Sequence, residues 1–318
     1  MNKKKKAVVT GGCGFIGSHI VDFLLNEGWR VSVVDNLSSG KIDNLKHCLS
    51  NVEITIADVR DEQALFKVFN EAEVVFHQAA FVSVPESEKN PSECFDVNIG
   101  GTIKVAKVAA NVGVKKIVFA SSCAVYGNSL DAPLTENSSL NPNSPYAYSK
   151  KAGEEILREI SCKSGISVVV LRYFNIYGPR QNPKGEYAAV ISKFIKDGLK
   201  KGRISIEGSG EQTRDFTFVI DVAKANLLAA VKDTGNFDIF NICSGVETSI
   251  NRLAMECSHL MSGINIEYTS ERKNDIMRSL GSYEKAKRAL SYFPAINLSE
   301  GLKLTINSFE ERDSDGEN

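Results

Sequence analysis

Long apolar runs and an excess of charge of either sign are both absent from this sequence. Lys and Arg number 38 against 39 Asp and Glu, a formal net charge of -1. A nucleic-acid-binding surface needs a basic excess, so we expect no nucleic-acid partner. No stretch approaches the ~18 apolar residues that span a membrane, so we expect no membrane association. The lysines at 3–6 run directly into apolar sequence without the pattern of a secretory signal, which predicts a cytoplasmic protein.

Paired cysteines are also absent. The seven cysteines are odd in number and contain no C-x-x-C spacing. This pattern excludes a disulfide framework and the common zinc sites. We therefore predict no metal site and a reducing compartment, in agreement with a cytoplasmic location.

Short apolar runs alternate with amphipathic stretches through the first 180 residues. The amphipathic stretches predict helices over 15–27, 61–70, 98–112 and 146–161. Because the apolar runs are continuous, they are typical of parallel strands covered by helices on both faces. Regular alternation of strand and helix then favours right-handed crossovers and a doubly wound sheet. The apolar runs are KAVVT, VSVVD, EITIAD, VVFHQAA, KIVFASS and SVVVLRYFN.

The pattern changes after residue 180. A loop and a helix are expected in QNPKGEYAAVISKFIKDGLKKG, a pair of strands in ISIEGSGEQTRDFTFV and a further helix in TSINRLAMECSHLMSG. The fold class predicted is therefore α/β: a doubly wound parallel (Rossmann) sheet over 1–180 and a smaller mixed α/β substrate-binding region over 181–309. A return of 215–245 to the Rossmann layer is the open alternative. The polar, acidic tail 310–318 is expected to be frayed.

A glycine-rich turn, GGCGFIG, follows the first predicted strand and opens the first predicted helix. Gly11 permits the tight turn, Gly14 lets the backbone approach a pyrophosphate, and Gly17 lets helix and strand pack closely. Asp35 ends the second predicted strand, where a carboxylate accepts both ribose hydroxyls and repels a 2′-phosphate. These features predict NAD, in preference to NADP. A purely structural turn, with Asp35 in an Asx turn, is the alternative.

A second constellation predicts redox chemistry. Tyr146 and Lys150 stand at i,i+4 at the start of a predicted helix, and Ser122 ends the fifth predicted strand. With Lys150 and a positive nicotinamide ring lowering its pKa, Tyr146 could take a hydroxyl proton while a hydride leaves the same carbon, and Ser122 would bind that oxygen. The same spacing recurs at Tyr283 and Lys287, which we interpret as a surface aromatic and a solvated lysine.

The motifs together resemble those of the extended short-chain dehydrogenase/reductases of the NAD-dependent epimerase/dehydratase family, and most closely its UDP-sugar 4-epimerases. Besides the glycine turn and the Tyr-x-x-x-Lys pair, they include VVDNLSSG, DVNIGGT, SSCAVYG, LRYFNIYGPRQ and GSGEQTRDFTFVIDVA, in an order that covers nearly the whole chain. The resemblance implies that NAD is the cofactor. The cofactor-binding residues that we predict, beside Tyr146 and Lys150, are Gly11, Gly14, Phe15, Ile16, Gly17, Asp35, Asn36, Ser38, Ser39, Gly40, Asp58, Val59, Gln78, Ala79, Ala80, Val82, Asn98 and Phe174.

The residues after Ser122 restrict the reaction. Relatives that dehydrate or decarboxylate sugar nucleotides carry acidic residues directly after the strand-end Ser or Thr. Here Cys123 and Ala124 stand there, and an ordinary thiol with a pKa of ~8.5 is a poor substitute for a carboxylate. What remains is reversible oxidation at one carbinol by Ser122, Tyr146, Lys150 and NAD. Epimerisation at C4 of a sugar through a 4-keto intermediate fits this requirement.

The resemblance also implies the substrate-binding residues, which are Ser83, Ser122, Asn175, Tyr187, Ala188, Ala189, Val190, Arg214, Arg272, Asp275 and Ser279. Guanidinium groups bind a diphosphate in bidentate fashion, which suits Arg214 and Arg272; a local ion pair of Arg214 with Asp215 is the alternative. Ser279 aligns where epimerases restricted to glucose and galactose carry a tyrosine beside the C2 substituent. A serine leaves room for an N-acetyl group, unless it faces solvent.

We therefore predict an isomerase that interconverts UDP-GlcNAc and UDP-GalNAc, and UDP-Glc and UDP-Gal as well. The alternatives are an epimerase of UDP-glucose alone, a UDP-glucuronate 4-epimerase, another NAD-dependent dehydrogenase or reductase, and an inactive NAD-binding regulator. The stretch 98–112 is apolar around more of its circumference than one core-facing stripe requires. Related epimerases pair through this helix and its neighbour over 146–161, so we expect a homodimer.

Overall fold

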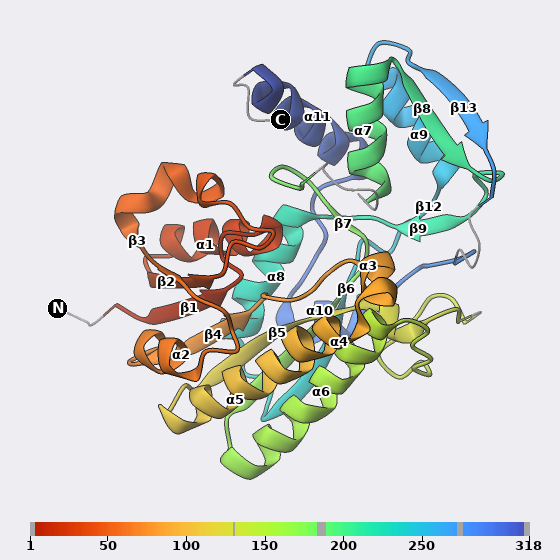
Figure 1. Cartoon of the computed structure of the whole chain (residues 1–318). Coiled ribbons are helices and arrows are strands. Elements are labelled where there is room, and N and C mark those ends of the chain that lie inside the picture. Colours follow the sequence, from red (N-terminus) through yellow and green to blue (C-terminus); the bar gives the residue numbers. More distant parts are fainter. Residues whose placement is uncertain (1–3, 130, 183–188, 272–275, 315–318) are drawn as a thin grey trace.

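The computed structural model describes residues 4–129, 131–182, 189–271 and 276–314. Its centre is a seven-stranded sheet in which every neighbouring pair is parallel, in the order β11-β6-β5-β4-β1-β2-β3. This is the predicted doubly wound Rossmann sheet (Figure 1). The strands are β1 (Lys6–Thr10), β2 (Arg30–Asp35), β3 (Val52–Ile56), β4 (Val74–His77), β5 (Lys116–Ser122), β6 (Ser167–Tyr173) and β11 (Phe237–Ile242).

Successive residues of a strand point to opposite faces of the sheet. Because the strands are mostly apolar, both faces carry apolar side chains, and helices cover each of them. In β5, Ile117 and Phe119 join the cluster shared with α2, α5 and α6, whereas Val118 joins the cluster shared with α1, α8 and α10. Figure 1 shows α5 and α6 side by side across one face. The helices of the two layers are α1 (Phe15–Asn26), α2 (Glu62–Phe69), α5 (Gly101–Asn111), α6 (Pro145–Ser164), α8 (Val219–Val231) and α10 (Glu284–Leu290).

The chain returns to the Rossmann layer after residue 215. Helix α8 packs against α1, and β11 pairs in parallel with β6 along its whole length. The apolar runs DFTFVIDVAKANLLAAV and FNICSG therefore supply a helix and an edge strand to the first layer. The sequence at 181–309 is consequently not one continuous structural unit.

The smaller region lies beyond the carboxyl ends of the strands. It contains α7 (Val190–Lys201), α9 (Ile250–Leu260) and α11 (Leu298–Ser314), with β8 (Arg203–Glu207) paired to β13 (Asn265–Thr269). Short pairs connect it to the sheet: β7 (Ile176–Tyr177) with β10 (Thr217–Phe218), and β9 (Thr213–Asp215) with β12 (Glu247–Ser249). Its core is a separate apolar cluster that includes Phe194, Ile204, Leu253 and Phe309.

Two expectations about this region are wrong. The sequence 204–219 does form strands, but β8, β9 and β10 each pair with a distant strand and not with one another. The tail expected to be frayed over 310–318 is helical over 310–314, because Phe309 and Ile306 anchor α11 in the apolar cluster, and 315–318 lie outside the described residues. Both differences arise from tertiary contacts with residues far away in the sequence.

Short helical segments fill the connections of the first layer. They are η1 (Ile42–Asn51), α3 (Val84–Lys89), α4 (Pro91–Phe95), the π-helical turn η2 (Asp96–Gly100) and η3 (Cys123–Tyr126). The helix predicted over 98–112 thus begins as a π-helical turn that continues into α5. Within the described ranges, no helix is both long and apolar enough to cross a membrane.

Candidate active site

A cavity of about 1820 Å³ lies along the carboxyl ends of the strands, between the Rossmann layer and the smaller region. Ligands of open α/β sheets bind at this edge. The cavity wall includes most of the residues that the sequence predicts for cofactor and substrate. These are Gly11, Gly14, Phe15, Ile16, Gly17, Asp35, Asn36, Ser38, Ser39, Asp58, Val59, Gln78, Ala79, Ala80, Val82, Ser83, Ser122, Tyr146, Lys150, Asn175, Ala189, Val190, Arg214 and Ser279.

The glycine-rich turn between β1 and α1 is built for close backbone approach. Gly11 has φ +69°, and a Cβ there would lie 2.7 Å from the backbone nitrogen of Ala79. A Cβ on Gly17 would lie 2.1 Å from the carbonyl oxygen of Gly11. Helix α1 begins directly after Gly14, with no side chain capping its first N–H groups. These free donors and the helix dipole suit a pyrophosphate, so the turn fits NAD.

Asp35 is the last residue of β2 and lies next to the glycine-rich turn that follows β1. Its carboxylate accepts the backbone N–H groups of Cys13 (2.9 Å) and Leu37 (2.8 Å). Burial raises the pKa of Asp35, and these two hydrogen bonds act in the opposite direction. The predicted Asx-type contact is therefore real, yet the same side chain also lines the cavity. The turn contact therefore leaves Asp35 at the cavity wall, and its contact with the ribose of NAD stays a prediction.

Ser122, Tyr146 and Lys150 converge although β5 and α6 supply them from separate parts of the chain. Helix α6 begins at Pro145, one residue before the predicted start: Ser144 is its N-cap and accepts the N–H of Ala147 at 3.2 Å. This places Tyr146 in the first turn, where its side chain lines the cavity together with Ser122. One turn later, Lys150 donates its Nζ to the carbonyl oxygen of Ala120 at 2.8 Å. The three predicted catalytic residues thus line one end of the cavity.

The charges at this end are shaped mainly by burial. It raises the pKa of Tyr146 to about 12, and the Ser122 hydroxyl acts in the opposite direction. Burial likewise lowers the pKa of Lys150 to about 8. The Nζ of Lys150 lies 5.9 Å from the centre of the Tyr146 ring. We expected Lys150 to help lower the pKa of Tyr146. In the protein alone the pKa of Tyr146 is raised instead, because desolvation is the largest effect on it.

Cys123 and Ala124 lie on the cavity wall directly after Ser122. Burial raises the pKa of the Cys123 thiol to about 11. At neutral pH this thiol is therefore neutral and cannot act as a general base. Neither residue can replace the carboxylates that elimination or decarboxylation would need at this position.

Three predicted cofactor residues do not line the cavity. Phe174 is fully buried in a small apolar cluster beneath it, beside Tyr126. Asn98 supports the cavity wall from behind: its side chain exchanges hydrogen bonds with the backbone of Phe81 and donates to Ser149. Gly40 packs against the carboxylate of Asp35, where a Cβ would lie 2.9 Å away. All three shape the site indirectly.

The substrate end of the cavity contains two residues of special interest. Ser279 is only 7% exposed and forms part of the wall, so it does not face solvent. Arg214 donates to the carbonyl oxygens of Thr213 (2.8 Å) and Ile276 (2.5 Å). The carboxylate of Asp215 is instead surrounded by the hydroxyl and N–H of Ser244 and by backbone N–H groups. Tyr187, Ala188, Arg272 and Asp275 lie outside the described residues.

Several wall residues were missed by sequence reasoning. Arg180 and Gln181 follow β7 and line the cavity. They could have been predicted, because they are the last two residues of the motif LRYFNIYGPRQ. Lys193 on α7 and Arg278 beside Ser279 also line the cavity. No spacing rule identifies these two, because α7 and the segment around Ser279 reach the wall only through the packing of the smaller region.

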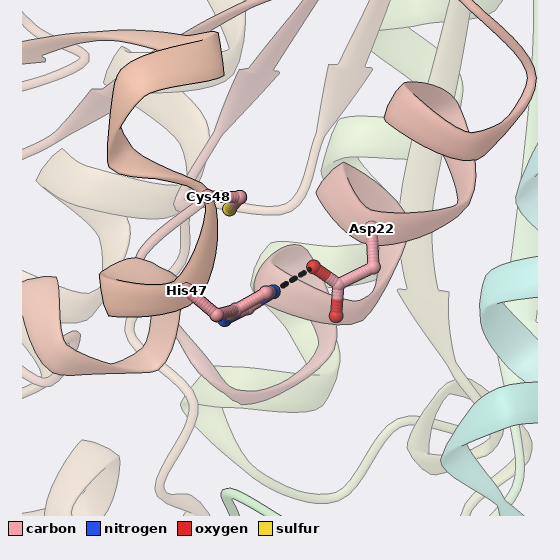
Figure 2. A group of neighbouring side chains, drawn as sticks. All are labelled: Asp22, His47 and Cys48. Carbon is pink, nitrogen blue, oxygen red and sulfur yellow. Dashed lines mark hydrogen bonds and ion pairs between the residues drawn. The ribbon is translucent and has the colours of Figure 1, made fainter.

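Asp22, His47 and Cys48 bring three potential metal-ligand atoms within 4.8 Å of one another (Figure 2). His47 Nε2 lies 2.7 Å from Asp22 Oδ1, and Arg180 Nη1 lies 2.7 Å from Asp22 Oδ2. The buried Cys48 thiol donates to the carbonyl oxygen of Leu45 at 3.4 Å. The guanidinium of Arg180 already neutralises Asp22. We therefore interpret the cluster as ion pairs that hold the segment after β7 against α1.

The second Tyr-x-x-x-Lys pair lies away from the cavity wall. Tyr283 packs edge-on against Tyr292 with ring centres 6.0 Å apart, and Lys287 lies over the ring of Phe293. Tyr283 is thus partly buried, in contrast to the surface position that we expected, because α10 packs against the edge strand β11. Its surroundings are those of a packing residue.

A model of the NAD dependent epimerase/dehydratase family matches residues 7–243. The chain belongs to this family. It is therefore an enzyme that acts on carbohydrates, and its cofactor is NAD.

Two solved structures are similar over nearly their whole length. A UDP-glucose 4-epimerase of Thermotoga maritima, solved with UDP-glucose, is 39% identical, with a TM-score of 0.91 and coverage of 96% of this chain and 99% of that one. A UDP-N-acetylglucosamine 4-epimerase of Methanobrevibacter ruminantium, solved with UDP-N-acetylmuramic acid, is 40% identical, with a TM-score of 0.93 and coverage of 98% and 99%. A UDP-N-acetyl-alpha-D-glucosaminuronate decarboxylase of Bacillus cytotoxicus is 33% identical over 98% of this chain and 100% of its own.

Proposed function

We propose that this protein is an NAD-dependent UDP-sugar 4-epimerase that interconverts UDP-GlcNAc and UDP-GalNAc, and UDP-Glc and UDP-Gal as well. One observation carries the proposal. The side chains of Ser122 and Tyr146 line the cavity together with Lys150, with Ser122 acting to lower the pKa of Tyr146, and Cys123 and Ala124 add no acidic group beside them. Such a site supports oxidation and reduction at one carbinol.

The roles of the residues follow from their positions. Bound NAD would accept a hydride from C4 of the sugar and return it to the other face of the same carbon. Tyr146 would take the proton of the C4 hydroxyl as the hydride leaves and give it back as the hydride returns, with Ser122 hydrogen-bonded to the same oxygen. Because the buried tyrosine has a pKa of about 12, a positive charge beside it is needed. Lys150 and the oxidised nicotinamide ring would supply this charge.

The decarboxylase among the relatives makes loss of carbon dioxide the main competing reaction. Against it stand Cys123, whose burial raises the pKa of its thiol to about 11, and Ala124, which has no polar group. A dehydratase is disfavoured by the same two residues, because it needs a base and an acid at this position. An epimerase of UDP-glucuronate remains a second candidate, since it would use the same Ser122, Tyr146 and Lys150.

The proposed acceptance of N-acetylated sugars rests on Ser279. Its burial at the cavity wall supports a place beside the sugar, where a small side chain leaves space. Filling that space with a larger side chain would exclude an N-acetyl group by steric clash. For Arg214 and Arg272 the proposal is that their guanidinium groups bind the diphosphate. Tyr187 to Val190 and Asp275 are proposed to contact the UDP-sugar as well.

We also propose that the enzyme is a cytoplasmic homodimer. Helices α5 and α6 pack side by side on the outer face of the sheet and leave Ile103 and Tyr148 exposed. Two copies of this helix pair would make a four-helix contact that covers both apolar side chains. The seven free cysteines suit a reducing compartment.

The function is tested with purified protein that receives UDP-GlcNAc, UDP-Glc or UDP-glucuronate in turn and no oxidant. We expect UDP-GlcNAc to give an equilibrium mixture with UDP-GalNAc, and UDP-Glc to give one with UDP-Gal. NAD should stay bound to the protein throughout. The reaction consumes no net redox equivalent, so release of NADH would leave a keto sugar behind. Stoichiometric NADH and 4-keto sugar in solution would show a dehydrogenase, and carbon dioxide from UDP-glucuronate would show a decarboxylase. Either outcome overturns the proposal.

A further inference from the structure

A buried ion pair lies directly behind the catalytic residues. Glu154 on α6 and Arg172 on β6 are 1% and 2% exposed. Arg172 donates its Nε to Glu154 Oε1 at 2.9 Å and its Nη2 to Glu154 Oε2 at 2.6 Å. Ser121 also donates its hydroxyl to Glu154 Oε1, at 2.5 Å. The carboxylate therefore has partners on both oxygens and is held in one orientation.

These contacts tie helix α6 to the end of β5 at three successive turns. Tyr146 interacts with Ser122, which acts to lower its pKa, and Lys150 donates to the carbonyl oxygen of Ala120. Glu154, one turn further along the same face, accepts from the residue between them, Ser121. The strand end that carries Ser122 is thus connected to the helix that carries Tyr146 and Lys150 by three consecutive residues.

The ion pair also extends across the sheet. Arg172 is the cross-strand neighbour of Ser121 on one side and of Asn241 on the other. Its Nη1 donates to the hydroxyl of Tyr126 at 2.9 Å, and this hydroxyl donates to Asn241 Oδ1 at 2.6 Å. Tyr126 ends the turn that begins just after Ser122. The segment between the strand end and Tyr126 is therefore held at both of its ends by the same arginine.

The groups around Lys150 leave Glu154 as the principal source of negative charge. Burial lowers the pKa of Lys150 to about 8, while Cys94 on α4 and Glu154 act in the opposite direction. Burial raises the pKa of the Cys94 thiol, so it is neutral at neutral pH. His77 on β4 is buried with its pKa lowered to about 3, and Tyr146 has its pKa raised to about 12, so both are neutral as well. Without Glu154, Lys150 and Arg172 would be two buried cations with no carboxylate between them.

We propose that Glu154, held by Arg172 and Ser121, is a positioning residue of the reaction: it keeps Lys150 charged and fixes the strand end that presents Ser122. It does not touch the sugar or the cofactor and acts only through these two catalytic residues. The inference rests on the proposed function, because it assigns Glu154 a role in that reaction. It adds a residue that neither the glycine turn nor the Tyr-x-x-x-Lys spacing indicates.

The first test is Glu154→Gln in the NAD-containing enzyme. The alkaline limb of the pH profile of kcat is expected near pH 8 in the wild type, since activity is lost as Lys150 loses its proton with rising pH. Removing the nearby carboxylate makes that proton easier to lose, so the limb should move to lower pH by about one unit. Above pH 8 the loss in kcat should then approach about tenfold, with KM changed by less than about twofold. Glu154→Asp should restore the limb in part.

Two further variants separate charge from geometry. Ser121→Ala removes one hydrogen bond to Glu154 and no charge, so the limb should stay in place while kcat falls about threefold through misplacement of Ser122. Glu155→Gln is the matched control, because Glu155 is exposed on the same helix and pairs with Arg158. It should behave as the wild type in both measurements.

A readout without turnover keeps the test independent of the proposed function. With ¹³C-labelled lysine, the Lys150 signal, assigned through Lys150→Met, is titrated by NMR in the NAD-containing wild type and in Glu154→Gln. A lower titration midpoint in the variant supports the inference even if no UDP-sugar is turned over. A folded Glu154→Gln protein with unchanged midpoint and unchanged limb overturns it, and so does Ser121→Ala with wild-type kcat. Should Glu154→Gln fail to fold, Glu154→Asp and Ser121→Ala decide the question.

Discussion

The side chains of Tyr146 and Ser122 interact across the boundary between the first turn of α6 and the carboxyl end of β5, where Ser122 acts to lower the pKa of Tyr146. The hydroxyl groups are side by side at one end of the large cavity, with the ammonium of Lys150 one helical turn below. A hydroxyl of a bound sugar could contact both at once. This arrangement links the fold to the proposed proton transfer.

Tyr146→Phe should lower kcat by at least ~10²-fold, because it removes a positioned acid/base and leaves the shape of the ring unchanged. The matched control is Tyr283→Phe, which alters the second Tyr-x-x-x-Lys pair. Since Tyr283 packs against Tyr292 away from the cavity wall, that variant should keep its activity. Initial rates of UDP-sugar interconversion measure both. Equal losses in the two variants would show that Tyr146 has no special role.

Asp35→Asn should weaken the preference for NAD over NADP. The carboxylate lines the cavity at the end of β2, where its charge would repel a 2′-phosphate, and the amide removes that charge with little change in shape. Binding of both cofactors to protein stripped of nucleotide is measured by calorimetry. Asp233→Asn changes the net charge equally, at the opposite edge of the sheet before β11 begins, and should leave the ratio of affinities unaltered. An unaltered ratio in Asp35→Asn as well would remove this residue from cofactor selection.

Ser279→Tyr should suppress turnover of the N-acetylated sugars selectively. Ser279 is buried at the cavity wall, so a tyrosine there would occupy space inside the site and not in solvent. The values of kcat/KM for UDP-GlcNAc and UDP-Glc are compared in the wild type and the variant. We expect the ratio to fall by about tenfold or more, as a steric clash with an N-acetyl group costs more than about 1.4 kcal/mol. The same ratio in both proteins would mean that Ser279 does not select the sugar.

Ile103→Glu should convert the proposed dimer to monomers. Ile103 is 42% exposed on the outer face of α5, and a charge there would be buried by a second copy. Leu304→Glu is the control, because Leu304 is 43% exposed on α11, in the smaller region. Light scattering at micromolar concentration reports the mass of each protein. A monomeric wild type would refute the dimer outright, and a dimeric Ile103→Glu would refute this interface.

Local features of the sequence determined a large part of this result. The strands of the first layer, the N-cap at Ser144 and the spacing of Tyr146 and Lys150 follow from patterns within a few residues, because helix and strand periods and capping are short-range effects. The glycine turn is of the same kind. Gly11 needs positive φ and Gly17 has no room for a side chain, and both requirements are met inside one turn.

Tertiary structure decided what no local pattern contains. Glu154, Arg172 and Ser121 are separated in the sequence, and only the packing of α6 on neighbouring strands β5 and β6 brings a carboxylate, a guanidinium and a hydroxyl into contact. The return of β11 to the sheet edge and the burial of Ser279 in the cavity wall are of this kind as well. In each case the physical reason is the same: burial and pairing depend on which distant segments become neighbours, and the local period of a sequence carries no information about them.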